Sequence, residues 1–113
     1  MLNVLTRLFS VKTADLEAKL RGVDGFTGYG EIEFAAYSSG ARCLEIEVRG
    51  AAGVSADIYV NGAMVGAVSL KNGRADEFLD TRHGHPVPFV NEGDAVEIRQ
   101  NGQTVLEGVM VRD

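Results

Sequence analysis

The sequence predicts a mainly β protein: an antiparallel β-sandwich or flattened barrel of six to eight strands, preceded by an N-terminal amphipathic helical segment. Asn-Gly pairs at positions 61–62, 72–73 and 101–102 lie between runs rich in β-branched and aliphatic residues. Asn followed by Gly is the pair that a tight type I′ hairpin turn accepts most readily. Polar and apolar residues also alternate along several segments, and no segment with helical periodicity lies between these predicted strands. We therefore expect a β-domain built from Asn-Gly hairpins.

Residues 1–22 differ from the rest of the chain. Residues 14–20 have an acidic first turn and a basic last turn, and Gly22 is a natural end for a helix. We predict one interrupted helix or two short ones over residues 1–22, followed by an antiparallel β-domain over residues 23–113, in a single domain overall. The first helical piece has apolar side chains at helical spacing: Leu2, Leu5, Leu8 and Phe9.

The strand pattern also predicts a core. Residues 31–37 and 44–48 alternate with period two, so one face of each strand should be buried. A bulge near Gly66 is needed to keep the apolar residues of that strand on one face. Residues 57–65 and 97–105 repeat one pattern around their Asn-Gly pairs. The side chains expected in the core are Ile32, Phe34, Leu44, Ile46 and Val48.

Composition excludes some classes of function. The 113 residues carry a formal net charge of −5, and Lys and Arg are not concentrated, which argues against nucleic-acid binding. No apolar run approaches the roughly 20 residues of a transmembrane span, and no signal-peptide cleavage site follows the apolar start. A single cysteine fits a reducing compartment. We expect a cytoplasmic protein.

The richest polar segment is the loop of residues 80–94, which holds both histidines and both prolines. One interpretation is a rigid, solvent-exposed loop that binds a ligand or a partner through Arg82, His83, His85 and Phe89. The alternative is a divalent transition metal site, because His-x-His in extended backbone can place two imidazoles on one ion and a carboxylate can complete the set. The metal ligands would be Asp80, His83 and His85.

Four glutamates should share one exposed face if their strands pair: Glu31, Glu33, Glu45 and Glu47. Such a face is either simply solvated or accepts a basic partner. No nucleophile elbow, phosphate-binding loop or dinucleotide motif occurs, which favours a non-catalytic protein without a cofactor.

The sequence thus predicts a non-catalytic binding or assembly module for a protein partner or for a second copy of itself. Leu2, Leu5, Leu8 and Phe9 would either pack on the β-domain or make the contact between subunits. The alternative function is the metal site on the loop of residues 80–94. The sequence does not indicate the chemistry of a small-molecule ligand.

Overall fold

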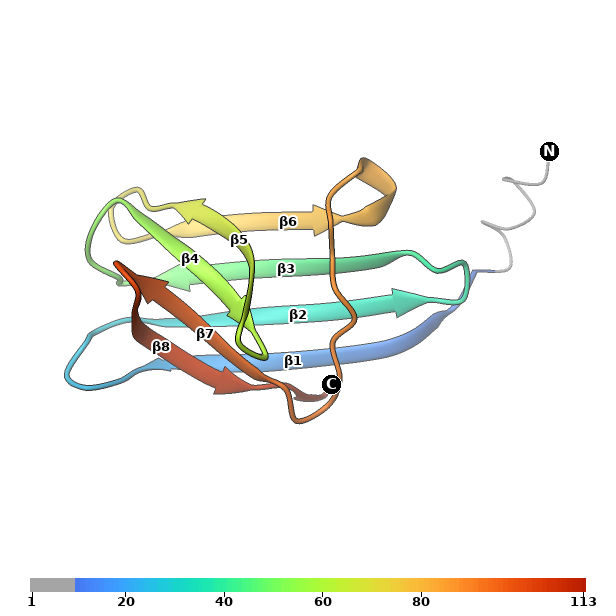
Figure 1. The fold of residues 1–113 in the computed structure, drawn as a ribbon, viewed down its shortest axis with the longest axis horizontal. Helices are drawn as coiled ribbons and strands as arrows, with labels where there is room; N and C mark the ends of the chain where they lie inside the picture. The colour runs from blue at the N-terminus through green and yellow to red at the C-terminus, as the bar shows by residue number, and fades with distance from the viewer. Residues whose placement is uncertain (1–9) are drawn as a thin grey trace.

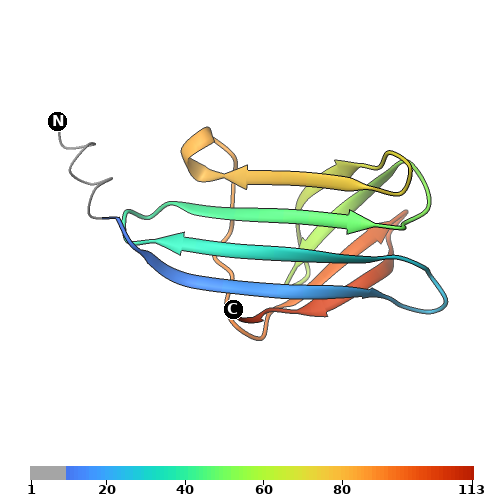
Figure 2. The same cartoon turned by 180° about the vertical axis from the view of Figure 1, so that it is seen from behind.

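The computed structural model describes residues 10–113, which form a mainly β structure as predicted (Figures 1 and 2). These residues contain no α-helix, and so no helix that is long and apolar enough to cross a membrane. The elements are β1 (Lys12–Gly22), β2 (Tyr29–Tyr37), β3 (Arg42–Arg49), β4 (Ser55–Val60), β5 (Ala63–Ser69), β6 (Ala75–Asp80), the 3₁₀ turn η1 (Thr81–His83), β7 (Ala95–Gln100), β8 (Gln103–Val109) and β9 (Val111–Arg112).

The nine strands of the described chain belong to one antiparallel sheet with the order β5-β4-β7-β8-β1-β2-β3-β6, and β9 extends β8 along β1. The two end strands, β5 and β6, approach each other, so the sheet curls into a nearly closed barrel. A Cβ added to Gly66 in β5 would lie 3.5 Å from Leu79 Cδ1 in β6. The Leu79 side chain of β6 therefore lies against β5 at Gly66, although the two strands do not pair.

The helix predicted over residues 14–20 is wrong, because this segment lies in β1. Its side chains alternate with period two: Leu16, Ala18 and Leu20 are buried, while those between them face outward. Pairing with β2 along almost its whole length outweighs a local composition that suits a helix. Leu2, Leu5, Leu8 and Phe9, the first part of the predicted helical segment, lie outside the described residues.

Two of the Asn-Gly pairs connect strands that are neighbours in the sheet. Asn61 and Asn101 have φ of 51° and 52°, and each is followed by a glycine of positive φ, as a type I′ turn requires. A register shift after each turn leaves one extra residue, Val65 in β5 and Val105 in β8. The first of these is the bulge predicted near Gly66. Both copies of the repeated pattern thus form the same bulged hairpin.

The third pair behaves differently. Asn72 has φ of 53°, and the turn is closed by an isolated bridge between Lys71 and Arg74. The strands on either side, β5 and β6, then diverge and do not pair with each other. The sequence predicts a hairpin tip here, and that prediction is wrong: the turn connects the two end strands of the sheet, which do not pair with each other.

One hydrophobic core fills the barrel. All five predicted core residues are at most 1% exposed: Ile32, Phe34, Leu44, Ile46 and Val48. Figure 1 shows that β4, β5, β7 and β8 cover only one half of the long strands β1, β2 and β3. The connection between η1 and β7 crosses the other half, and its Val87 and Val90 are buried in the same core. This loop replaces strands as the second layer there.

Candidate functional site

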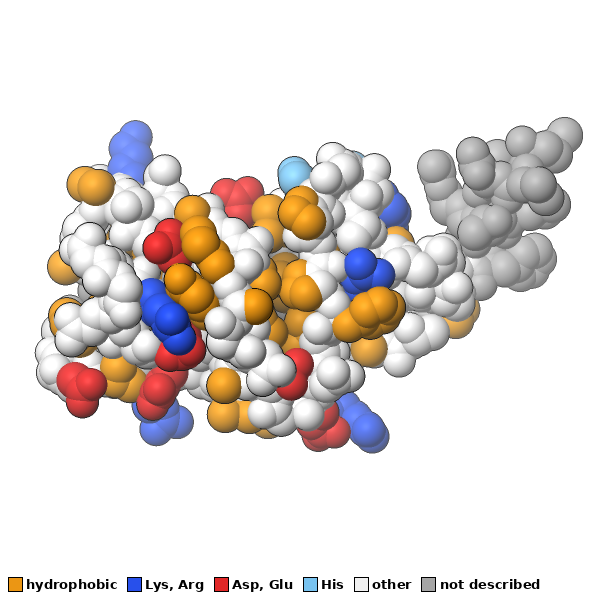
Figure 3. All heavy atoms as spheres, in the orientation of Figure 1, with side chains coloured by type: hydrophobic (Ala, Val, Ile, Leu, Met, Phe, Trp, Pro, Cys, Tyr) orange, Lys and Arg blue, Asp and Glu red, His pale blue; other side chains and the backbone are white. Residues whose placement is uncertain are grey.

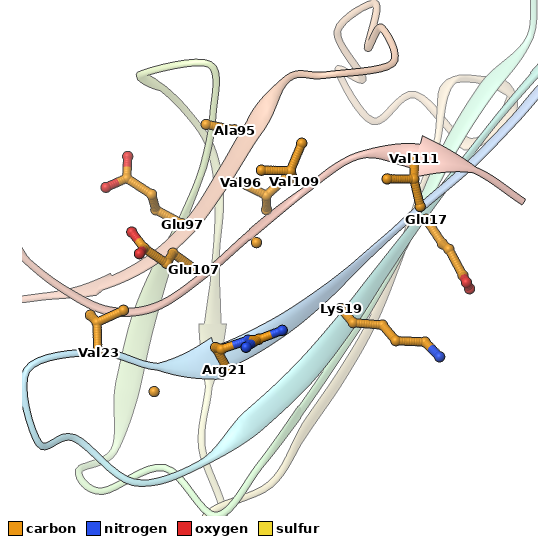
Figure 4. Close-up of a pocket in the computed structure, with 12 residues that line it drawn as sticks. Glu17, Lys19, Arg21, Val23, Ala95, Val96, Glu97, Glu107, Val109 and Val111 are labelled. Carbon is orange, nitrogen blue, oxygen red and sulfur yellow. The ribbon is translucent and has the colours of Figure 1, made fainter.

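The described chain has a large groove on the outside of the barrel, where β1 meets β8 and β9. Its volume is about 1010 Å³, which is large enough for a small ligand or several residues of a peptide. Figure 4 shows the groove, which is bounded by β1 on one side and by β7, β8 and β9 on the other. It is lined by Glu17, Lys19, Arg21, Gly22, Val23, Ala95, Val96, Glu97, Glu107, Gly108, Val109 and Val111.

The groove lies where the ladder between β1 and its neighbours is interrupted. β1 pairs with β8 at Arg21–Glu107 and again with β9 at Glu17–Val111. Both pairings keep one register, with three residues of each chain segment between them, yet no ladder pair joins those residues. Gly108 lies in this gap, and a Cβ there would clash with the Lys19 carbonyl oxygen. Glycine is therefore what permits the close approach of the two backbones at this point.

The floor of the groove is apolar and its walls are charged. Val109 and Val111 remain 52% and 50% exposed, although valine is usually buried in a sheet. Figure 4 shows Lys19 and Arg21 projecting from β1, and Glu97 and Glu107 from the opposite wall. The groove thus offers exposed valine side chains between a basic wall and an acidic wall.

The two acids of the acidic wall differ in their surroundings. Glu97 accepts hydrogen bonds from Thr104 Oγ1 (2.6 Å) and Arg99 Nη2 (2.8 Å), and these donors lower the pKa of its carboxyl. Glu107 lies directly opposite Glu97 in the β7–β8 ladder, and no ion pair within 4 Å joins it to another residue in the described range 10–113. Glu107 is therefore the acid of this wall that an incoming cation would meet.

The predicted binding loop is organised around a buried ion pair. The Asp80 side chain is 3% exposed and receives a two-pronged contact from Arg82, with Nε 3.0 Å from Oδ1 and Nη2 2.7 Å from Oδ2. The Arg82 backbone N–H also donates to Oδ1 at 2.8 Å, so Asp80 caps η1. The guanidinium holds the pKa of the Asp80 carboxyl at about 2, well below its ordinary value of 3.8. Asp80 primarily positions Arg82, whose side chain is 55% exposed.

Both histidines lie beside this pair. The Asp80 backbone N–H donates to His85 Nδ1 (3.0 Å), so that nitrogen acts as an acceptor inside the protein. The His83 and His85 rings are 6.2 Å apart and nearly perpendicular. Phe89, 74% exposed, makes its contact with a different element: the Arg42 guanidinium of β3 lies 4.3 Å from its ring centroid. The structure therefore brings Asp80, Arg82, His83 and His85 together and pairs Phe89 with β3.

The predicted glutamate face is present on the outside of β1, β2 and β3. Glu31 lies opposite Glu47, and Glu33 lies opposite Glu45. β1 adds Glu17 opposite Glu33, which the sequence analysis did not expect. Carboxylate oxygens of Glu17, Glu31 and Glu33 lie within 4.8 Å of one another, the one grouping of three possible metal ligands within residues 10–113. A hydrogen bond shared with Glu31 raises the pKa of the Glu17 carboxyl. We call these five glutamates the acidic ladder.

The remaining outer surface is mixed. Over β4 and β7 the Arg99 guanidinium stacks 3.9 Å from the Tyr59 ring centroid, and it also pairs with Glu97. Figure 3 shows hydrophobic side chains on this face interspersed with acidic and basic ones. The groove beside β1 is therefore the place where exposed valines line a defined cavity.

Sequence reasoning missed the groove because its walls come from segments about 90 residues apart. Reading residues 14–20 as a helix also removed one wall from consideration. A local signal was present: Val109, the last residue of β8, and Val111, the first residue of β9, are separated by one residue, and both are exposed.

A scan against models of known protein families finds no match to this chain, and a search of curated proteins also finds none.

Proposed function

We propose that this protein is a non-catalytic assembly module that self-associates through the groove between β1 and β8. The observation that supports this proposal most directly is the pair of half-exposed valines, Val109 and Val111, on the floor of a cavity of about 1010 Å³. Exposed apolar surface that lies in a cavity and is rimmed by charges is typical of interaction sites.

Charge distribution favours a second copy over an unrelated partner. In an interface with two-fold symmetry the same patch meets itself, so it must be self-complementary. A wall with Lys19 and Arg21 facing a wall with Glu97 and Glu107 has this property when the two-fold axis runs along the groove, because that half-turn places each wall against its opposite. Partner binding by Arg82, His83, His85 and Phe89 stays a prediction of the sequence analysis.

Light scattering over a range of protein concentrations tests the proposal. We expect a mass above that of one chain, and we expect Val109→Asp to shift the protein to the single-chain mass, because a buried, unpaired carboxylate opposes association. Met64→Asp is the matched control, since Met64 is also in a strand and is 54% exposed, but lies outside the groove. A single-chain mass for the unmodified protein, or an unchanged mass for Val109→Asp, would refute the proposal.

The metal site of Asp80, His83 and His85 stays a prediction as the alternative function. What favours it is the proximity of the two imidazoles, 6.2 Å between ring centroids, with His83 exposed. The Asp80 carboxylate and His85 Nδ1 already have hydrogen-bond partners, so binding would require those bonds to be exchanged. Zinc titration followed on the imidazole resonances decides this point; unshifted resonances at micromolar zinc would exclude the site.

A further inference from the structure

We propose that the occupant of the groove is the apolar segment of residues 2–9, supplied by a second copy of the chain. This inference rests on the proposed function and names the partner surface. The segment carries five apolar residues among eight and a single charge, that of Arg7. The floor of the groove is apolar, and one wall carries a carboxylate, that of Glu107, that lacks an ion-pair partner within the described range.

The length of the segment prevents it from filling the groove of the same copy. The described chain begins at Ser10, whose hydroxyl donates to Ser39 Oγ (3.1 Å) at the far end of β1 from Val23. A strand rises about 3.3 Å per residue, so Lys19 lies about 30 Å from Ser10 along β1. Eight residues span at most about 28 Å when fully extended. Glu17, at the near end of the groove, is only about 23 Å from Ser10 and can be reached by the first residues of the segment. The rest of the groove lies beyond that point, so the segment of the same copy cannot fill it.

A second copy removes this limit. Its segment can enter the groove from outside, with its apolar side chains on Val109 and Val111 and the Arg7 guanidinium near the Glu107 carboxylate. If each copy gives its segment to the other, both grooves are filled and the assembly closes as a dimer with two-fold symmetry. Such an exchange buries apolar surface from the segment and the groove together, which is the favourable contribution that association needs.

A charge-exchange cycle in the full chain tests the contact. Arg7→Glu and Glu107→Arg should each weaken association about tenfold, since each places like charges together. The double variant should return to within about threefold of the unmodified protein, because the pair is restored with reversed polarity. Glu77→Arg is the control for the change in net charge, as Glu77 is exposed on β6 and does not line the groove. The readout is the dimer dissociation constant from sedimentation equilibrium.

Removal of residues 1–9 provides a second measurement. We expect the shortened protein to keep its far-ultraviolet circular dichroism, because the sheet begins at Lys12, and to associate at least about a hundredfold more weakly. If it associates as tightly as the full chain while Val109→Asp still prevents association, the groove is the interface and residues 2–9 are not its occupant. If the double charge variant is as weak as the two single variants combined, the Arg7–Glu107 contact is refuted whether or not the shortened protein folds.

Discussion

At the scale of single residues, Asp80 and Arg82 form an unequal pair. The carboxylate is buried and the guanidinium is half-exposed, so loss of either partner has different consequences. Arg82→Ala leaves a buried carboxylate with fewer donors, and we expect it to lower the free energy of unfolding by about 2 kcal/mol at neutral pH. Arg112→Ala is the control, because its 3.9 Å contact with Glu92 is exposed and should contribute almost nothing. Urea unfolding measures both.

The same pair predicts a response to acid. The pKa of Asp80 is about 2 in the folded protein and is near 3.8 for an ordinary aspartate, so the unfolded chain binds its proton first as the pH falls. The stabilisation from this pair is complete above about pH 5 and is lost progressively as the pH falls toward about 2. Arg82→Ala should therefore flatten the loss of stability over this interval. An acid profile identical in slope to that of the unmodified protein would show that Asp80 is not responsible.

Two glycines in the repeated hairpins, Gly66 in β5 and Gly108 in β8, have opposite tolerances. A Cβ at Gly108 would overlap the Lys19 carbonyl oxygen, whereas a Cβ at Gly66 would make an ordinary 3.5 Å contact with Leu79. We expect Gly108→Ala to cost about 2 kcal/mol, because the backbone of β1 cannot move aside easily. Gly66→Ala should be neutral or slightly stabilising, because alanine restricts the unfolded chain. Thermal unfolding of the two variants compares them directly, and equal losses would contradict the close approach at Gly108.

At the scale of elements, the acidic ladder places like charges directly across neighbouring strands. Glu33 lies opposite both Glu17 and Glu45 and is the centre of this repulsion. Glu33→Gln should raise the free energy of unfolding by about 0.5 kcal/mol at low ionic strength. The gain should shrink in about 0.5 M NaCl, since salt screens exposed charges. Glu77→Gln is the control on β6, and an equal gain there would mean that net charge alone is responsible.

Glu17 gives the ladder a pH dependence opposite to that of Asp80. The pKa of Glu17 is raised in the folded protein by its hydrogen bond with Glu31, so the folded state holds this proton more tightly than the unfolded chain. Its contribution to stability is present at acid pH and is lost as the pH rises through the folded pKa. Glu17→Gln should keep the hydrogen bond at all pH values and remove that loss, as thermal unfolding across a pH series would show.

The elements that the sequence predicts correctly are those specified by local signals. Asn61-Gly62 and Asn101-Gly102 define turns without reference to the rest of the chain, and alternation identifies the buried faces of β2 and β3. β1 was misread because Ala, Leu, Glu and Lys over residues 14–20 are good helix formers in isolation. What makes this segment a strand is pairing with β2 on one side and with β8 and β9 on the other. The strands β8 and β9 are far from β1 in the sequence, so local patterns cannot reveal this pairing.

The candidate site depends on the same distant pairing. Asp80, Arg82, His83 and His85 are within six residues of one another, so their clustering follows from the sequence alone. The groove needs β1 and β8 to meet, and the interruption of their ladder becomes visible only when both strands are placed. The contact of Phe89 with Arg42 likewise depends on how the connection after η1 crosses β3.

At the scale of the whole molecule, two layers of different construction enclose one core. Figure 2 shows the long strands β1, β2 and β3, with the shorter β6 beside β3, as a continuous layer. The shorter strands β4, β5, β7 and β8 form the opposite layer, and the loop that carries Val87 and Val90 extends it. β3 and β4 are consecutive in the chain yet do not pair, so within residues 10–113 the two layers are joined by strand pairing only where β1 meets β8 and β9.

This arrangement predicts that the described part of the chain unfolds as a single unit. The core draws residues from both layers, and neither layer can cover its apolar face alone, so separation of β1 from β8 should expose both at once. Tyrosines report on each layer separately: Tyr29 and Tyr37 lie on β2, and Tyr59 lies on β4. Tyr59→Phe leaves probes only in the long-stranded layer, and the double variant Tyr29→Phe/Tyr37→Phe leaves a probe only in the other.

We expect the fluorescence and circular dichroism transitions in urea to coincide within each of these two variants. Each substitution can shift the midpoint of its own variant, so the comparison is between probes in one protein and not between proteins. If the layers were independent, tyrosine fluorescence in at least one variant would report a midpoint different from that of the whole sheet. Two separate transitions would also contradict the single-domain prediction. They would mean that the two layers, which meet where β1 pairs with β8, are each stable alone.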